Sequence, residues 1–233
     1  MSHFSVLVLT DSCTGPDEAL APFNENLEVD SYICMTREEA LKSTNWYRED
    51  LIKKDPDRFK NMSDNDFLEY AFDGSVDKDF NVLSTMNPNG KWDWYSIKKG
   101  RWGSAPIPRK AEFGGQGCLS CLVKEISFES NKDDYKEALE FWDKNVEHAT
   151  DESGKTLYYR ENYKNAEDYA LRCSKFSTYA VITPDGVWHE AGELGWFAMS
   201  SASPEDKQKW ASEYESLVGQ YPDATATFVD CHI

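Results

Sequence analysis

The 233-residue chain has few basic residues and no long apolar run. No stretch approaches the roughly 18 apolar residues that a membrane-spanning helix needs, so we expect no contact with a membrane. Lys and Arg number 25 against 42 Asp and Glu, which gives a formal net charge of −17. Binding to phosphate backbones requires a basic surface, and duplex nucleic acid is therefore not an expected partner. An acidic surface instead favours solubility or contact with a basic protein.

The common catalytic signatures are also missing. The sequence contains no nucleophile elbow, P-loop, dinucleotide-binding glycine fingerprint or His-Glu-x-x-His motif. A Gly-Gly-Gln-Gly run at residues 114–117 lacks the Lys-Ser/Thr that completes a phosphate-binding loop. The sequence therefore indicates no particular cofactor, and any cofactor stays unknown at this point.

Six cysteines are present, but their spacing defines no complete metal site. Cys118 and Cys121 form one C-x-x-C pair, as in half of a zinc ribbon, and no second pair follows at a suitable spacing. A strand-like run begins directly after Met1 without a secretory leader, so we expect a cytoplasmic protein in which disulfides are rare. We therefore expect the cysteines to be free thiols that pack as small apolar side chains.

The most unusual window is residues 87–102, the tryptophan stretch, which holds three of the eight tryptophans. Its Asn-Pro-Asn-Gly start predicts a turn, because Pro fixes φ and Asn-Gly tolerates positive φ. A short strand is expected next, with Trp92 and Trp94 on one face and with Asp93 and Tyr95 on the other. A glycine then ends the strand.

The tryptophan stretch has two interpretations. As a ligand platform, its indoles would stack on flat bases, at roughly 1–3 kcal/mol per base, while cations hold phosphate and polar groups contact base edges. As part of a hydrophobic core, the same tryptophans would simply be buried. The residues assigned to the ligand platform are Asn87, Asn89, Lys91, Trp92, Asp93, Trp94, Tyr95, Arg101 and Trp102, with Trp196 from a later loop.

The chain opens with Met-Ser-His-Phe-Ser-Val-Leu-Val and contains Asn-Pro-Asn-Gly-Lys-Trp-Asp-Trp-Tyr. It then passes through Gly-Glu-Leu-Gly-Trp-Phe at residues 192–197 and closes on Val-Asp-Cys-His-Ile. These segments resemble an uncharacterised protein family of tailed bacteriophages and bacteria. The chain departs from the family pattern at residues 96–100, which contain one residue more and a Lys in place of a Gly. The resemblance carries no activity, and it implies a phage-type protein of the bacterial host cytoplasm.

Apolar periodicity and turn signals predict an α+β protein with a single elaborated domain over residues 1–233. We expect an antiparallel sheet with helices packed on one face, on the pattern of a ferredoxin-like core with insertions. The strands nearest the two termini should lie side by side and antiparallel. A loop-rich insertion is expected around residues 103–117. Predicted strands span residues 4–9, 118–128, 176–182, 187–189 and 225–233, and predicted helices span 36–54, 64–72, 132–148, 165–173 and 204–219.

Pairing of the terminal strands would place His3 near Cys231 and His232. Two imidazoles and a thiol can bind zinc or act as acid and base. Cys231 and His232 point to opposite faces of one strand, however, so no metal is assigned. Glu193 and His189, which lie close together in the sequence, are further catalytic candidates.

Three functions are compatible with these patterns. The first is non-enzymatic binding of a small aromatic or nucleotide-like ligand, which in a phage-type protein would sequester a host immune nucleotide signal. The second is a protein–protein inhibitor that uses the acidic surface to bind a host protein. The third is a nucleotide phosphodiesterase or another hydrolase that uses Glu193 with His189 or His232. Binding is ranked first and the enzymatic function stays open.

Overall fold

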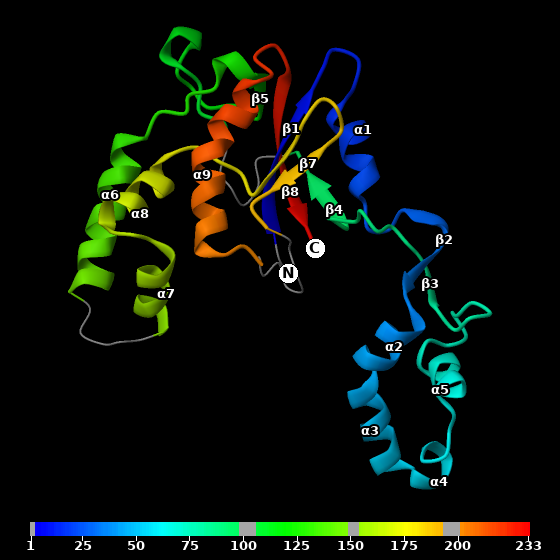
Figure 1. Cartoon of the computed structure of the whole chain (residues 1–233). Coiled ribbons are helices and arrows are strands. Elements are labelled where there is room, and N and C mark those ends of the chain that lie inside the picture. The colour runs from blue at the N-terminus through cyan, green and yellow to red at the C-terminus, as the bar shows by residue number, and fades with distance from the viewer. Residues whose placement is uncertain (1–2, 98–105, 149–153, 193–200) are drawn as a thin grey trace. The chain divides into compact units, whose positions relative to one another are not determined.

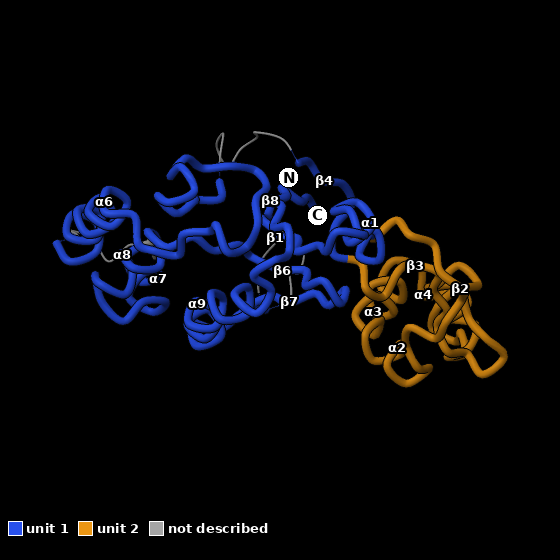
Figure 2. Tube along the Cα trace, turned by 90° about the horizontal axis from the view of Figure 1, so that it is seen from above, with its two compact units in different colours: residues 1–24, 91–233 blue, residues 25–90 orange. Residues whose placement is uncertain are grey.

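The computed structural model describes residues 3–97, 106–148, 154–192 and 201–233. The chain forms two compact units (Figure 2), one of residues 1–24 and 91–233 and the other of residues 25–90. Each unit has a hydrophobic core of its own. The expectation of a single elaborated domain stays a prediction.

The larger unit is built on a six-stranded sheet (Figure 1) with the order β4-β8-β1-β6-β7, and β5 also pairs with β8. The two longest strands, β1 and β8, pair antiparallel from His3 opposite His232 to Thr10 opposite Thr225. This confirms the predicted pairing of the terminal strands. The strands are β1 (His3–Thr10), β4 (Trp94–Ser96), β5 (Ser120–Leu122), β6 (Ala180–Ile182), β7 (Trp188–Glu190) and β8 (Thr225–His232).

The α+β class is confirmed, and the strand arrangement differs from the expected one in two respects. Strands β1 and β6 are parallel, so the sheet is mixed. A ferredoxin-like core separates its parallel strands by another strand, whereas β1 and β6 are direct neighbours. Strand β5, like β1, is antiparallel to β8, and the helical segment between β5 and β6 returns the chain in the direction of β5, so β6 runs parallel to β1.

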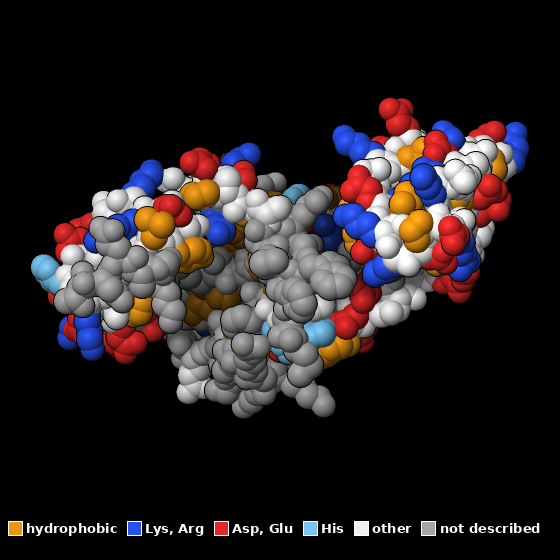
Figure 3. Space-filling view, turned by 90° about the horizontal axis from the view of Figure 1, so that it is seen from below, with side chains coloured by type: hydrophobic (Ala, Val, Ile, Leu, Met, Phe, Trp, Pro, Cys, Tyr) orange, Lys and Arg blue, Asp and Glu red, His pale blue; other side chains and the backbone are white. Residues whose placement is uncertain are grey.

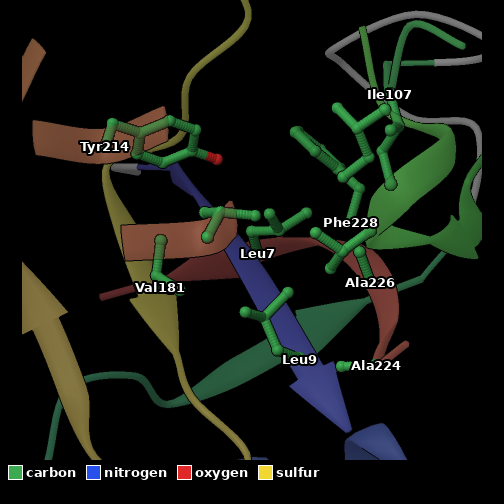
Figure 4. Close-up of a cluster of buried hydrophobic side chains, with 11 residues drawn as sticks. Leu7, Leu9, Ile107, Val181, Tyr214, Ala224, Ala226 and Phe228 are labelled. Carbon is green, nitrogen blue, oxygen red and sulfur yellow. The ribbon is translucent and has the colours of Figure 1, made fainter. Parts of the chain in front are cut away.

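Alternation along β1 builds two apolar surfaces. Leu7 and Leu9 lie beside Phe228 of β8 (Figure 4) and pack under Tyr214 and Val218 of α9 (Pro204–Gly219). The residues that alternate with Leu7 and Leu9 along β1 point to the opposite face of the sheet. They form a second buried cluster, to which α1 (Pro16–Leu20) contributes its last residue. The sheet is therefore covered on both faces, with the longest helix, α9, on one of them.

The remaining helices of this unit precede β6. They are α6 (Lys132–Trp142), which continues as a π-helical turn to Glu147, α7 (Gly154–Asn162) and α8 (Ala166–Ser174). The predicted hairpin is confirmed, because β6 and β7 pair antiparallel around a turn in which Gly186 has a φ of 78°. The predicted start of α9 is also confirmed, with a capping box between Ser203 and Asp206.

The smaller unit combines a two-stranded sheet with four helices. Its core contains Ala40, Leu68 and Val82. The capping box of Thr36 with Glu39 is present as predicted, but the helix expected over residues 36–54 is divided at Thr44. The elements are β2 (Glu28–Met35), α2 (Arg37–Ser43), α3 (Asn45–Lys54), α4 (Pro56–Phe59), α5 (Asp64–Ala71) and β3 (Val82–Met86).

The surface agrees with the mixed charge of the sequence. On the face shown in Figure 3, acidic and basic side chains are interspersed and form no continuous basic area. Within the part of the chain that the structure describes, no helix is long and apolar enough to cross a lipid bilayer.

Candidate functional site

A group of ionisable and aromatic side chains gathers where β1 begins and β8 ends. His3 pairs with His232 across the two strands, and Asp230 lies on the same face as both. Strand β4 pairs with the other edge of β8 and sets Trp94 opposite His232, directly after Asp93. We call these five residues the His–Asp cluster.

Each histidine of the cluster is held by a carboxylate. Nδ1 of His3 lies 3.0 Å from Oδ1 of Asp230, and Nδ1 of His232 lies 2.7 Å from Oδ1 of Asp93. An ionised carboxylate only accepts hydrogen bonds, so each Nδ1 must be the donor. A neutral ring then has its free lone pair on Nε2. The two carboxylates therefore fix both the orientation and the tautomer of the imidazoles.

The opposite nitrogen of His232 is the most unusual atom of the cluster. Its Nε2 is buried and has no hydrogen-bond partner among the described residues. A buried polar atom without a partner costs about 1–3 kcal/mol. The side chains of His232 and His3 are only 12% and 16% exposed, so both rings are largely withdrawn from solvent. A buried nitrogen without a partner is uncommon in folded proteins, and it marks His232 as a candidate functional residue.

The rings of the cluster are packed against one another. The centroids of His3 and His232 are 5.3 Å apart, and Trp94 stacks on His232 at 5.0 Å with an interplanar angle of 17°. The rings of His3 and Trp94 are nearly perpendicular, with centroids 5.2 Å apart. Trp94 nevertheless remains 42% exposed. Its indole therefore both supports His232 and offers apolar area beside the imidazoles.

Trp92 has a different position from Trp94. It is only 5% exposed, and its Nε1 donates a hydrogen bond of 3.3 Å to the carbonyl oxygen of Leu20. The prediction that Trp92 and Trp94 share one face is wrong, because the chain bends at Asp93 before β4 begins. Trp92 packs edge-on against Tyr95 in the cluster on the α1 side of the sheet. This position gives no support to stacking of a ligand on Trp92.

Other residues assigned to the ligand platform make internal contacts. Lys91 forms an ion pair of 2.7 Å with Glu190 of β7. The hydroxyl of Tyr95 donates a hydrogen bond to Asp17, and burial, followed by this bond, raises the pKa of Tyr95 to about 12. These contacts engage the polar groups that were expected to hold a ligand.

The predicted turn at the start of the tryptophan stretch is present. Asn87 accepts a hydrogen bond from the backbone N–H of Gly90 through its carbonyl, and one from that of Asn89 through its side chain. Both asparagines belong to the smaller unit, whereas Asp93 and Trp94 belong to the larger one. Binding roles for Asn87 and Asn89 stay predictions.

Several predicted site residues lie outside the described ranges. These are Arg101 and Trp102 of the tryptophan stretch, Glu193 and Trp196 of the later loop, and residues 103–105 of the loop-rich insertion. Their assigned roles stay predictions.

His189 does not join the cluster. It lies on β7 opposite Val181, and its Nε2 is 3.3 Å from Oγ1 of Thr183. It lines a cleft of about 650 Å³ between β7 and α9, together with Trp210 and Glu213. His189 is therefore placed at a different part of the sheet from His3 and His232.

Cys231 also lies apart from the two histidines, as its place in the strand predicted. Its side chain is fully buried on the α1 side of the sheet, where burial raises the pKa of the thiol. Zinc sites use three or four protein ligands. The described residues contain no such group of His, Cys, Asp or Glu side chains. His3 and His232 alone would give a metal only two nitrogen ligands.

The residue patterns assign Asp93 to the ligand platform and do not single out Asp230. Asp230 stands two residues before His232, so strand alternation puts both on one face, and this spacing is the signal that indicates Asp230 from the sequence. The role of Asp93 depends on the pairing of β4 with β8, where the backbone N–H of Asp93 donates to the carbonyl of His232 at 3.0 Å. No sequence pattern indicates that contact.

Comparisons of the chain with protein-family models, with curated proteins and with solved structures found no match. The function is therefore argued from the geometry of the site.

Proposed function

We propose that the His–Asp cluster binds a small nucleotide-like ligand and hydrolyses a phosphodiester bond in it by acid–base catalysis. One observation carries this proposal. Two neighbouring imidazoles each have Nδ1 bound to a carboxylate, and neither carboxylate occupies Nε2 of its ring. Pairs of this kind are suited to proton transfer, because a carboxylate orients the ring and stabilises its charged form.

The chemistry needs only the two rings and a water molecule. One neutral imidazole accepts a proton at Nε2 from the water that attacks phosphorus. The other, protonated imidazole donates its Nε2 proton to the leaving oxygen as the phosphorus–oxygen bond breaks. The products are a phosphate monoester and an alcohol. General acid–base catalysis by such groups contributes about 10²–10⁴-fold each.

Trp94 supports a nucleotide-like substrate. Its exposed area lies beside the two imidazoles, and base stacking on an indole is worth roughly 1–3 kcal/mol. A chain with a net charge of −17 repels long polyanions. A small ligand with few phosphates therefore fits the protein better than a polynucleotide.

Binding without turnover is the second candidate. It is favoured by the burial of Nε2 of His232, since catalysis by this ring requires proton exchange with water and the nitrogen is withdrawn from solvent, whereas binding can use the exposed indole of Trp94. In a phage-type protein, tight binding would sequester a host nucleotide signal. The same residues serve both functions, and only turnover separates them.

The experiment combines product analysis with calorimetry. The purified protein is incubated with a panel of linear and cyclic dinucleotides, products are followed by liquid chromatography and mass spectrometry, and binding is measured by isothermal titration calorimetry. The variants are His3→Gln and His232→Gln. His148→Gln is the matched control, because the side chain of His148 is 74% exposed and lies on another element.

The expected result is turnover by the wild-type protein and by the control, with a loss of about 100-fold or more in each cluster variant. Binding that needs His232 but yields no product would replace hydrolysis by sequestration. Absence of both binding and turnover across the panel would contradict both candidates. An equal loss in His148→Gln would show that the effect is unrelated to the cluster.

A further inference from the structure

A second cavity lies between helices α8 and α9. Its volume is about 390 Å³, within the range of about 300–1,000 Å³ that small-molecule sites occupy. Phe128 and Phe176 line it together with residues of the two helices. None of its lining residues belongs to the His–Asp cluster, so it is an independent feature of the molecule.

The floor of the cavity is aromatic, and the polar atoms of its rings already have hydrogen-bond partners within the protein. Tyr214 is 2% exposed, and its ring lies 6.3 Å from both Phe128 and Phe176 and 5.6 Å from Trp210. The hydroxyl of Tyr214 is 3.0 Å from Oγ1 of Thr178, and Nε1 of Trp210 donates to the carbonyl of Thr178 at 3.0 Å. The polar atoms of these rings are used internally. A ligand would therefore meet mainly carbon on this floor.

The rim of the cavity is cationic, although the chain is strongly acidic. Arg172, Lys175 and Lys207 line it, against the carboxylates of Asp168 and Glu215. Arg172 is fully engaged on one side, because its Nε and Nη2 bind the two oxygens of Asp168 at 3.1 and 2.6 Å. Lys175 is only loosely paired, with its Nζ at 3.8 Å from Glu215. One positive charge remains in excess around an apolar floor.

We propose that this cavity binds a small, flat aromatic compound that carries one negative charge. The aromatic ring lies on the floor formed by Tyr214 and the two phenylalanines. The anionic group faces Lys175 and Lys207, and the ammonium of Lys207 donates a hydrogen bond of 3.1 Å to Oδ1 of Asn162, a neutral partner that leaves its charge uncompensated. Arg172 contributes a fixed positive charge beside them. Neither a cationic nor a purely aliphatic compound matches both surfaces.

The test uses two dyes of similar shape and different charge. 1-Anilinonaphthalene-8-sulfonate is an aromatic anion with a flat naphthalene ring, and N-phenyl-1-naphthylamine is its neutral counterpart. Both are titrated into the 233-residue protein with fluorescence detection. The double variant Lys175→Met/Lys207→Met removes the rim charges, and Ala211→Phe places a ring in the cavity from α9. Lys136→Met is the matched control, because Lys136 lies on α6 and is 78% exposed.

The wild-type protein and Lys136→Met should bind the sulfonate dye more tightly than the neutral dye. The double lysine variant should bind the sulfonate about fivefold or more weakly and leave binding of the neutral dye unchanged. Ala211→Phe should weaken binding of both dyes. The proposal is overturned if the wild-type protein increases the fluorescence of neither dye. It is also overturned if the sulfonate dye binds to the double lysine variant as tightly as it binds to Lys136→Met.

Discussion

The same two strands build both the core and the candidate site. On the face that α9 covers, Leu7 of β1 lies opposite Phe228 of β8, and both are buried hydrocarbons. A few residues along this face, His3 lies opposite His232 and next to Asp230, and these side chains are almost as well buried. One end of the strand pair is thus apolar and the other is ionisable.

The apolar end of the strand pair therefore contributes to stability, and the ionisable end is the candidate for function. Burial of hydrocarbon stabilises the fold, whereas burial of ionisable groups is costly unless they are paired. The cluster recovers part of this cost through its two histidine–carboxylate hydrogen bonds, but it leaves Nε2 of His232 without a partner in the described chain. Departures of this kind from a well-packed core are typical of functional sites.

The two tryptophans around the bend at Asp93 should show the largest contrast. Trp92→Ala removes a buried indole and should lower the free energy of unfolding by about 3–5 kcal/mol. Trp94→Ala should lower it far less, and should instead weaken ligand binding by roughly 1–3 kcal/mol. Urea denaturation and calorimetric titration measure the two quantities. Equal destabilisation by both substitutions would assign Trp94 to the core.

The apolar end of the strand pair should respond through stability alone. Leu7→Ala leaves a cavity under α9 and should cost about 2–5 kcal/mol of unfolding free energy. Leu157→Ala is the control, because Leu157 is 57% exposed and its truncation should cost about 0.5 kcal/mol or less. Urea denaturation of both variants checks this, and a similar cost for the two would refute the assignment of Leu7 to the core.

The ionisable end should respond through activity. Asp230→Asn and Asp93→Asn replace an acceptor by an amide that also donates, so the tautomer of the partner histidine is no longer fixed. Turnover, or affinity if the protein only binds its ligand, should fall by about 10- to 100-fold. Asp143→Asn is the control, since Asp143 faces the exposed His148. An unchanged activity in both cluster variants would argue against an orienting role.

An ion pair far from the cluster should give the smallest effect. Burial alone would raise the pKa of Asp168, but the hydrogen bonds of Arg172 and of the Lys164 backbone outweigh it, so this pKa lies below its ordinary value. A lowered folded-state pKa stabilises the protein above the unfolded-state pKa, and this contribution is lost as the pH falls through the folded-state value.

Asp168→Asn should therefore cost about 1 kcal/mol or less at neutral pH, and the difference from the wild type should vanish in acid. Urea denaturation at neutral pH and at successively lower values measures the difference. A difference that grew on acidification would contradict the sign of this pKa shift.

The sequence predicted the part of the site that depends on strand alternation and on the pairing of the longest strands. Apolar runs at both ends indicated β1 and β8, and their antiparallel register brought His3 to His232. The short strand β4 was expected within the tryptophan stretch, but its pairing with β8 could not be predicted, because β4 is three residues long and its partner is distant in the sequence. The opposite orientations of Trp92 and Trp94 arise from a backbone bend that no residue pattern marks.

The most direct test of the central claim is the tautomeric state of the two histidines. Long-range ¹H–¹⁵N correlation spectra distinguish a proton on Nδ1 from one on Nε2 in neutral imidazoles, and the His3→Gln and His232→Gln variants assign the signals. For each ring in its neutral form the structure predicts the Nδ1–H tautomer, so that protonation adds the second proton at Nε2. Spectra that show the Nε2–H tautomer in both rings would contradict the proposed site.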